Sequence, residues 1–197
     1  INWIHSNNDS QKVSEKELIN CSYTFIILRS PFTRLSSYFL DKIVGSSSDI
    51  GKGDESYNNT IFDSNFDCED LTFEKFVNIV WENPKLIYKD IHTTPQIEFL
   101  LFNEYDKWVA LENLSKELNE IEENSGIKFI DTRKSVKNNT YKGQIINNKY
   151  FGDINVKSLR DLKSKKIFPS HFMLYSNETA YKCLNLYISD IFLYIEK

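Results

Sequence analysis

The sequence is poor in several residue types, and each shortage excludes a class of protein. Of 197 residues, only three are cysteine, six glycine, four proline and two alanine. So few cysteines exclude a disulfide-stapled mini-protein, and so little glycine and proline excludes a collagen-like or low-complexity chain. No stretch approaches the roughly 18 uninterrupted apolar residues that a membrane span requires. With 41% apolar and 26% charged residues, the composition is instead typical of one globular domain.

The three cysteines, Cys21, Cys68 and Cys183, are far apart, with neither a CxxC pair nor a histidine at metal-ligand spacing. We therefore expect buried or free thiols in a reducing compartment, and no bound metal. In contrast, aromatic residues are abundant, with 14 Phe, 11 Tyr and 3 Trp. They predict a core filled by aromatic rings and isoleucine.

Charge is distributed unevenly along the chain. The 24 basic and 28 acidic residues give a net charge of −4, which provides no general attraction for nucleic acid or an anionic membrane. Between Arg133 and Lys166, however, ten basic and two acidic residues give a net charge of +8, which leaves −12 for the rest. Such a basic segment either docks an anionic ligand or forms a solvated helix face, and the sequence leaves both interpretations open.

Hydrophobic patterning predicts alternating strands and helices. The apolar run 24–28 predicts a strand buried on both faces, as in a parallel sheet, and the spacing from Pro31 predicts a helix that Gly45 closes. Residues 45–68, rich in Ser, Asn, Asp and Gly, predict a long irregular loop. Further elements are expected as helices over 71–82, 113–124 and from Ser176 or Asn177 to Ile195, and as a short strand over 108–111. This alternation favours an α/β layer fold.

Arg29 and Ser37 form the clearest local arrangement of chemical groups. Arg29 follows a predicted strand, and ligands of open α/β sheets bind at the carboxyl ends of strands. A guanidinium there can hold a phosphate through two parallel hydrogen bonds. Ser37, about two helical turns later, can offer a hydroxyl toward the same side. The alternative is that Arg29 makes a structural ion pair at the strand end.

The run from Tyr23 to Lys42 resembles the 3′-phosphate-binding segment of the Golgi-type carbohydrate sulfotransferases. The shared pattern is an apolar strand that ends in Arg29, then Pro-Phe-x-Arg-Leu, and then Ser37. Ser30 and Thr33 stand where that family usually has acidic residues.

Further stretches resemble the same family in the same order, so that the likeness spans roughly residues 14 to 194. Ile91–Gln96 is similar to its His-x-x-Pro-Gln element, although Thr93 stands where tryptophan is usual. The other similar stretches are Tyr105–Leu114 (a Tyr-Asp strand leading to Glu-x-Leu), Asn138–Tyr141 (Asn-x-Thr) and Tyr181–Tyr194 (the closing helix).

The resemblance implies a single domain over residues 1–197 with a P-loop-NTPase-like three-layer α/β fold, a parallel central sheet flanked by helices. It also implies transfer of a sulfuryl group from 3′-phosphoadenosine 5′-phosphosulfate to a carbohydrate hydroxyl, without a metal. Arg29 and Ser37 would hold the 3′-phosphate of that donor, and Lys137 with Thr140 would close over the nucleotide. A nucleotide kinase is disfavoured because the chain has no GxxxxGK[ST] motif.

The reaction needs a base for the acceptor hydroxyl, and a neutral histidine suits that role near pH 7. His92 lies in the matching motif, and His5 precedes Arg29 by the 24 residues at which related uronyl sulfotransferases place a catalytic histidine. The sequence does not choose between these two and the remaining candidates, His171, Glu98 and Glu112.

One element of the family has no counterpart here. Its 5′-phosphosulfate loop, a Lys-x-x-x-Thr/Ser turn between a strand and a helix, is not found in residues 1–28. We therefore expect the domain to be N-terminally incomplete. The alternative is a catalytically inactive glycan-binding or partner-binding module on the same fold.

The partner expected from these features is a glycan, not a nucleic acid, and the basic segment favours an acidic or already sulfated acceptor. A composition rich in Asn, Ile and Lys is typical of an AT-rich, bacterial genome and favours the cytoplasm. The Golgi lumen is the alternative, and the six Asn-x-Ser/Thr sequons do not decide between the two compartments, because their excess over chance is modest. The acceptor sugar and the oligomeric state do not follow from the sequence.

Overall fold

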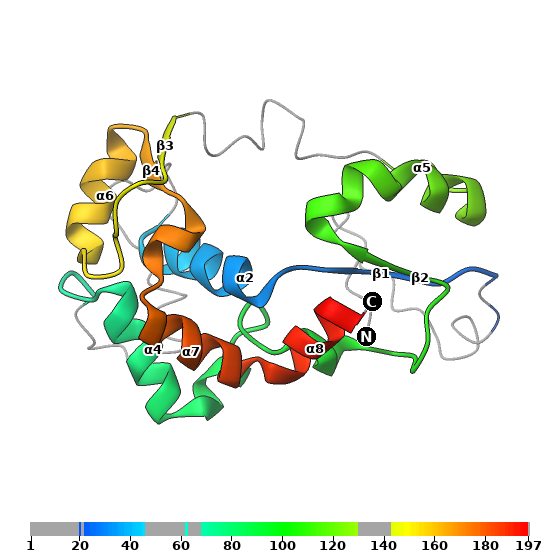
Figure 1. Ribbon diagram of the computed structural model, residues 1–197, viewed down its shortest axis with the longest axis horizontal. Coiled ribbons are helices and arrows are strands. Elements are labelled where there is room, and N and C mark those ends of the chain that lie inside the picture. The colour runs from blue at the N-terminus through cyan, green and yellow to red at the C-terminus, as the bar shows by residue number, and fades with distance from the viewer. Residues whose placement is uncertain (1–19, 21, 46–61, 63–67, 130–142, 197) are drawn as a thin grey trace.

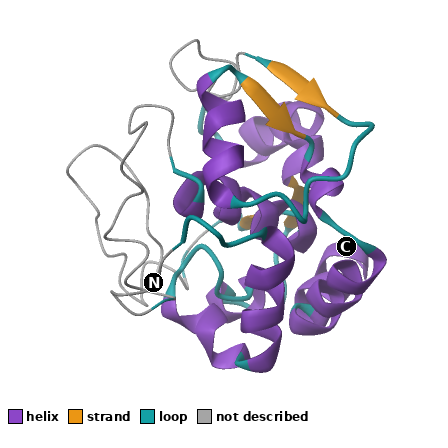
Figure 2. Ribbon diagram, turned by 90° about the vertical axis from the view of Figure 1, so that its left-hand side faces the viewer, coloured by secondary structure: helices purple, strands orange, loops and turns teal. Residues whose placement is uncertain are grey.

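The computed structural model describes residues 20, 22–45, 62, 68–129 and 143–196, and it combines helices with two small parallel sheets (Figures 1 and 2). The strands are β1 (Phe25–Leu28), β2 (Lys107–Ala110), β3 (Gln144–Ile146) and β4 (Ile167–Pro169). The α-helices are α2 (Pro31–Tyr38), α4 (Phe73–Glu82), α5 (Leu114–Ser125), α6 (Val156–Ser164), α7 (Asn177–Leu186) and α8 (Ile188–Glu196). Shorter helical turns are η1 (Phe39–Ile43), η2 (Pro84–Lys89), η3 (Gln96–Phe99), η4 (Leu111–Asn113) and η7 (His171–Leu174).

Both sheets are parallel pairs. In the first, β1 lies beside β2 with Phe25 opposite Lys107 and Leu28 opposite Ala110. In the second, β3 lies beside β4, at the upper edge of the molecule in Figure 2. The prediction of helices combined with parallel strands is thus confirmed, and so are the predicted positions of β1 and β2.

The prediction that β1 is buried on both faces is wrong. Ile27 is 40% exposed, and Phe25 and Ile26 are only half-buried. Among the described residues β1 has one hydrogen-bonded neighbour, β2. An apolar run reports the preference of its side chains for burial, whereas the burial itself depends on how many layers cover the strand.

The helix predicted to begin at Pro31 is present, and its last turn is a π-helix. Pro31 occupies the first helical turn, where its missing N–H is no loss. Leu35, Phe39 and Ile43 are buried along one face. Gly45 has a φ of 98°, which allows the chain to leave the helix at the predicted residue.

Two cations of the basic segment hold the carboxyl end of this helix. Arg160 on α6 donates from Nε to the carbonyl oxygen of Val44 at 2.9 Å. Lys163 donates from Nζ to the carbonyl oxygens of Leu40, at 2.9 Å, and Gly45. These carbonyl groups have no partner within the helix itself, so α6 caps the end of η1. Part of the basic segment therefore serves the fold, which neither interpretation from the sequence included.

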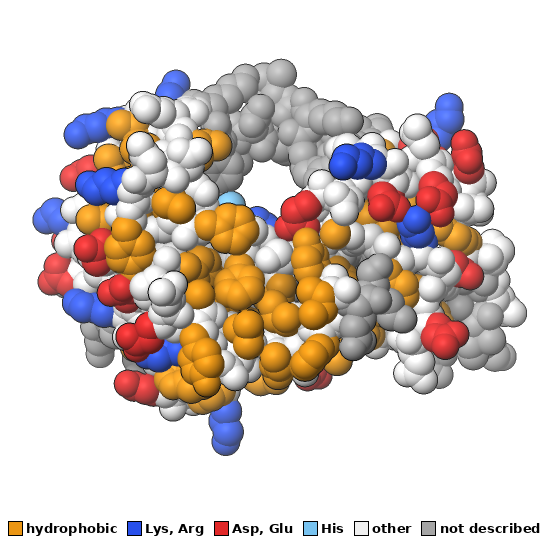
Figure 3. Space-filling view, in the orientation of Figure 1, with side chains coloured by type: hydrophobic (Ala, Val, Ile, Leu, Met, Phe, Trp, Pro, Cys, Tyr) orange, Lys and Arg blue, Asp and Glu red, His pale blue; other side chains and the backbone are white. Residues whose placement is uncertain are grey.

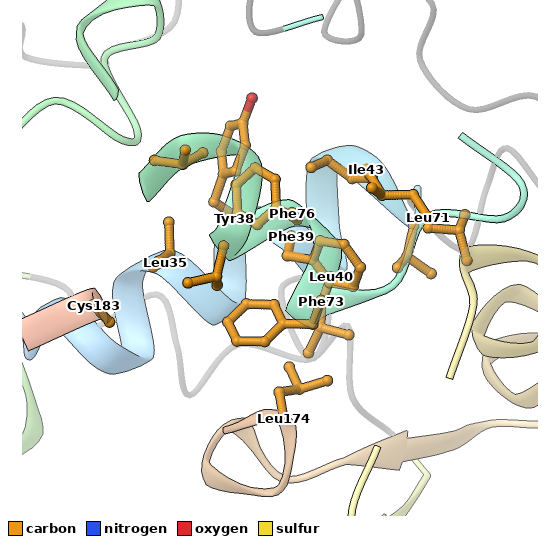
Figure 4. Packing of buried hydrophobic residues seen from close by; sticks show 14 of the residues in the cluster. Leu35, Tyr38, Phe39, Leu40, Ile43, Leu71, Phe73, Phe76, Leu174 and Cys183 are labelled. Carbon is orange, nitrogen blue, oxygen red and sulfur yellow. The ribbon is translucent and has the colours of Figure 1, made fainter. Parts of the chain in front are cut away.

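The main core lies in the helical part of the molecule and is rich in aromatic rings, as predicted (Figure 4). Phe39, Phe73 and Phe76 are fully buried. The rings of Phe39 and Phe73 meet edge to face, with centroids 5.3 Å apart. Cys183 is also buried there as a thiol, and burial raises its pKa to about 12. This core fixes α2 against α4 and α7, and so positions the residues that α2 carries.

The predicted C-terminal helix is two helices that meet at Tyr187. Ser176 caps α7 through a reciprocal pair of hydrogen bonds with Thr179, so the predicted start is correct. The predicted apolar stripe is largely exposed, since Tyr181, Phe192 and Ile195 are each more than half exposed. Orange side chains accordingly gather over α7 and α8 in Figure 3. Tyr187 separates the two helices with a φ of −119° and a ψ of 30°, and its buried hydroxyl donates to the carbonyl oxygen of Thr93 at 2.7 Å.

Candidate functional site

A cavity of about 380 Å³ lies where β1 ends and α2 begins. The residues that line it are Arg29, Arg34, Ser37, Tyr38, Asp41, Lys42, Ile91 and His92. The first six come from one continuous stretch, the end of β1 through α2 and η1, and the last two from the segment between η2 and η3. Cavities of this size bind small molecules. Two segments about 60 residues apart in the sequence thus build one site.

Arg29 and Ser37 reach this cavity because of the local strand-turn-helix geometry. Arg29 is the residue directly after β1, and Ser37 lies in the second turn of α2. Ser37 follows Arg29 by eight residues, or about two helical turns, so its hydroxyl can face the same side of the helix. The expectation that both side chains face one site agrees with the lining of the cavity.

Charge in the cavity is predominantly positive. Arg29, Arg34 and Lys42 are opposed by the single carboxylate of Asp41. Burial lowers the pKa of Arg34, although a guanidinium remains charged in proteins. Fixed cations in a partly enclosed cavity attract an anion more strongly than the same cations in open water. The cavity is therefore suited to an anionic ligand.

Arg34 holds the opposite wall in place. Its guanidinium donates to the carbonyl oxygen of Thr94 at 2.6 Å and to that of Ile91 at 2.9 Å. These two bonds tie the segment around His92 to α2. The second arginine of the Arg-Ser-Pro-Phe-x-Arg run thus has a positioning role.

Gln96 joins the same segment to the end of β1. Its side-chain amide donates from Nε2 to the carbonyl oxygen of Arg29 at 2.8 Å, and its Oε1 accepts the N–H of Arg29 at 2.9 Å. The buried carboxylate of Asp190 on α8 in turn accepts the backbone N–H groups of Gln96 and Ile97, at 2.7 and 3.0 Å. The backbone of Arg29 is therefore held by a chain of contacts that begins at α8.

His92 is held by Asp90. One carboxylate oxygen of Asp90 lies 2.7 Å from Nδ1 of His92 and accepts the backbone N–H of His92 at 2.8 Å. The Asp90 side chain is 5% exposed, whereas that of His92 is 46% exposed. A buried carboxylate thus carries a histidine at the edge of the cavity.

His171 lies against α2 outside this lining. Its Nδ1 is 3.0 Å from the hydroxyl oxygen of Ser36. Burial lowers the pKa of His171, and the nearby charge of Arg29 lowers it further. The ring is therefore neutral near pH 7, beside the site but not among the residues that line the cavity.

The structure brings together Arg29, Ser37 and His92, three of the six residues predicted for the site. His5, Lys137 and Thr140 lie outside the described residues. The two carboxylates considered as bases, Glu98 and Glu112, do not line this cavity.

Sequence reasoning missed Asp90, Lys42 and the positioning roles of Arg34 and Gln96. Gln96 had a signal, since it is the last residue of the His-x-x-Pro-Gln element. Asp90 lies two residues before His92, and this short spacing to a candidate base is the only signal that the sequence offers for it.

No group of three His, Cys, Asp or Glu side chains in the described part of the chain is arranged to hold a metal ion. None of the helices described is long and apolar enough to cross a membrane.

Comparison with known proteins adds one finding. The profile of the sulfotransferase family matches residues 2–191. No curated protein and no solved structure matches the chain. The matched range covers both walls of the cavity, from Arg29 to His92, and also Asp190 on α8. On this match over nearly its whole length, the chain belongs to the sulfotransferase family.

Proposed function

We propose that this protein transfers a sulfuryl group from 3′-phosphoadenosine 5′-phosphosulfate to a carbohydrate hydroxyl. The observation that carries the proposal is the lining of one cationic cavity by Arg29, Ser37 and His92. Family membership supports sulfuryl transfer in general. The choice of donor and of acceptor class rests on the motifs of residues 23–42 and 91–96 and on the chemistry of this cavity.

The residues present fit the 3′-phosphate of such a donor. Arg29 supplies a guanidinium that can bind two phosphate oxygens, and Ser37 supplies a hydroxyl donor. Lys42 adds a further cation to the same lining. The backbone of Arg29 is fixed through Gln96, which holds in place the point from which its side chain reaches the cavity.

His92 suits the role of general base. The bound donor would supply an electrophilic sulfur, and its bond to the nucleotide phosphate breaks as the acceptor oxygen bonds to sulfur. His92 would take the proton of the acceptor hydroxyl on its ring. Arg29, Ser37 and Lys42 are assigned to the 3′-phosphate, so the charge that grows on the departing 5′-phosphate is not assigned to them. The proton of the acceptor is accounted for by His92.

The same proposal places β1 and β2 in the central sheet of a P-loop-NTPase-like three-layer fold. Their parallel register supports it, as does the position of Arg29 at a carboxyl strand end, where open α/β sheets bind ligands.

Thermal unfolding with nucleotides tests the donor site. Adenosine 3′,5′-bisphosphate should raise the melting temperature, whereas adenosine 5′-monophosphate, which lacks the 3′-phosphate, should raise it much less. Arg29→Ala should remove most of the shift, and Lys116→Ala, a change at an exposed cation on α5, should leave it intact. An unchanged melting curve at millimolar bisphosphate would contradict the proposal.

A turnover assay separates the enzyme from the inactive binding module. Protein that is stabilised by the bisphosphate should move labelled sulfate from the donor to a glycan. Stabilisation without transfer to any acceptor in a panel of neutral, uronate-containing and sulfated glycans would favour the binding module.

A further inference from the structure

We propose that Asp90 is the positioning residue that selects the tautomer of His92 and aims its ring. Only one part of this inference rests on the proposed function, namely the consequence that His92 acts as a base. The tautomer itself is a property of this chain and can be measured without substrate.

A single oxygen of Asp90 makes both contacts to His92. This oxygen accepts the backbone N–H at 2.8 Å and faces Nδ1 at 2.7 Å. Because an ionised carboxylate only accepts hydrogen bonds, we assign the proton of this short contact to Nδ1. In a neutral ring, Nε2 then carries the lone pair, and it is the nitrogen that can accept a proton.

The backbone around this pair is braced from several sides. The carbonyl oxygen of Asp90 accepts the N–H groups of Thr93 and Thr94, at 3.0 and 2.9 Å. The Thr93 hydroxyl, which is buried, donates to the carbonyl oxygen of Ile87 at 2.9 Å. Arg34 and Tyr187 donate to further carbonyl oxygens of the same turn, so the carboxylate is presented to the ring at a fixed place.

A fixed carboxylate at Nδ1 has two chemical effects. It raises the fraction of neutral rings whose Nε2 carries the lone pair, and it fixes the direction in which the ring points. The competing explanation is that Asp90 only caps the turn through the backbone N–H of His92. The two explanations differ in what the ring nitrogens of His92 show when the carboxylate is made an amide.

The direct test is the long-range ¹H–¹⁵N spectrum of the histidine rings in uniformly ¹⁵N-labelled protein. The chain contains three histidines, so one substitution at His92 assigns its signals. At a pH where the ring is neutral, the wild-type protein should show a protonated Nδ1 and an unprotonated Nε2. A wild-type ring protonated at Nε2 instead would overturn the proposal.

Asp90→Asn extends the test because the amide keeps the shape of the side chain but can turn its NH₂ group toward Nδ1. We expect the His92 signals to move toward the Nε2-protonated pattern. Asp161→Asn, at an exposed position on α6, is the matched control and should leave the spectrum unchanged. Unchanged His92 signals in folded Asp90→Asn protein would show that the residue only caps the turn. If this variant does not fold, the wild-type spectrum still decides.

Measurement of kcat and KM then tests whether the tautomer of His92 affects the reaction. Asp90→Asn should lower kcat by about 100-fold or more, the range for loss of an oriented general base, with KM changed less than about twofold. Asp161→Asn should leave both constants unchanged. If Asp90→Asn shifts the tautomer but leaves kcat unchanged, Asp90 still positions the ring, and His92 is not the base of the proposed mechanism. Failure of the positioning role and failure of the proposed mechanism are therefore distinguishable.

Discussion

Gln96 pairs with the backbone of Arg29 as a neighbouring strand would, through one donated and one accepted hydrogen bond, at 2.8 and 2.9 Å. The contact joins residues 67 positions apart. It extends the hydrogen bonding of β1 by one residue beyond Leu28, to the residue that enters the cavity. The Pro-Gln element and the arginine after the strand therefore act as one unit.

Gln96→Glu should disrupt this unit. The substitution replaces the amide Nε2 by a carboxylate oxygen, which then faces the carbonyl oxygen of Arg29 and lies near the carboxylate of Asp190. Loss of a hydrogen bond of about 1 kcal/mol together with the new repulsion should weaken binding of adenosine 3′,5′-bisphosphate by roughly tenfold or more. Isothermal titration measures the change. Gln144→Glu, at an exposed position on β3, is the control, and equal losses in both variants would refute the pairing as a determinant of affinity.

Lys163→Met should destabilise the protein. Its ammonium caps the carbonyl oxygens of Leu40 and Gly45, and burial lowers its pKa. Methionine fills a similar volume but leaves both acceptors without this donor, at a cost of about 1–3 kcal/mol in the free energy of unfolding. Urea unfolding measures it. Lys165→Met removes an exposed cation two residues later, so a similar loss there would show that charge, and not capping, is responsible.

Local sequence patterns predicted the structural features that depend only on residues nearby in the sequence. Pro31, Gly45 and Ser176 mark helix ends because proline, positive φ and side-chain caps act within one turn. Arg29 and Ser37 were placed together for the same reason, since a helix has a fixed rise per residue.

What escaped prediction depends on distant partners. The exposure of Ile27 depends on how many layers cover β1, and the hydrogen bond of the Tyr187 hydroxyl depends on the carbonyl oxygen of Thr93, 94 residues away. Likewise Asp90 differs from other aspartates only through the turn that presents it to His92. Neither contact distance nor burial is encoded in the spacing of residues along the chain.

Tyr187→Phe should lower the melting temperature. The hydroxyl of Tyr187 is buried and donates to the carbonyl oxygen of Thr93, in the turn that carries His92. Removing it leaves that carbonyl oxygen without this donor and should cost about 1–2 kcal/mol, or roughly 2–8 °C for a domain of this size. Tyr181→Phe changes a side chain that is 64% exposed and serves as the control. Equal melting temperatures for the two variants would contradict a structural role of the bond.

His171→Asn should make the protein lose less of its free energy of unfolding in mild acid. Burial lowers the pKa of His171 below its ordinary value of 6.5 in the folded state. The unfolded chain therefore binds a proton first as the pH falls, and stability is lost below about pH 6.5, until the folded state also takes up a proton. Asparagine can still donate from Nδ2 to the hydroxyl oxygen of Ser36 but does not titrate. Urea unfolding from pH 8.5 to 5.5 should give parallel curves for variant and wild type above about pH 7.5. Below about pH 6.5 the fall should be steeper for the wild type, and curves that stay parallel throughout would show that this ring does not contribute.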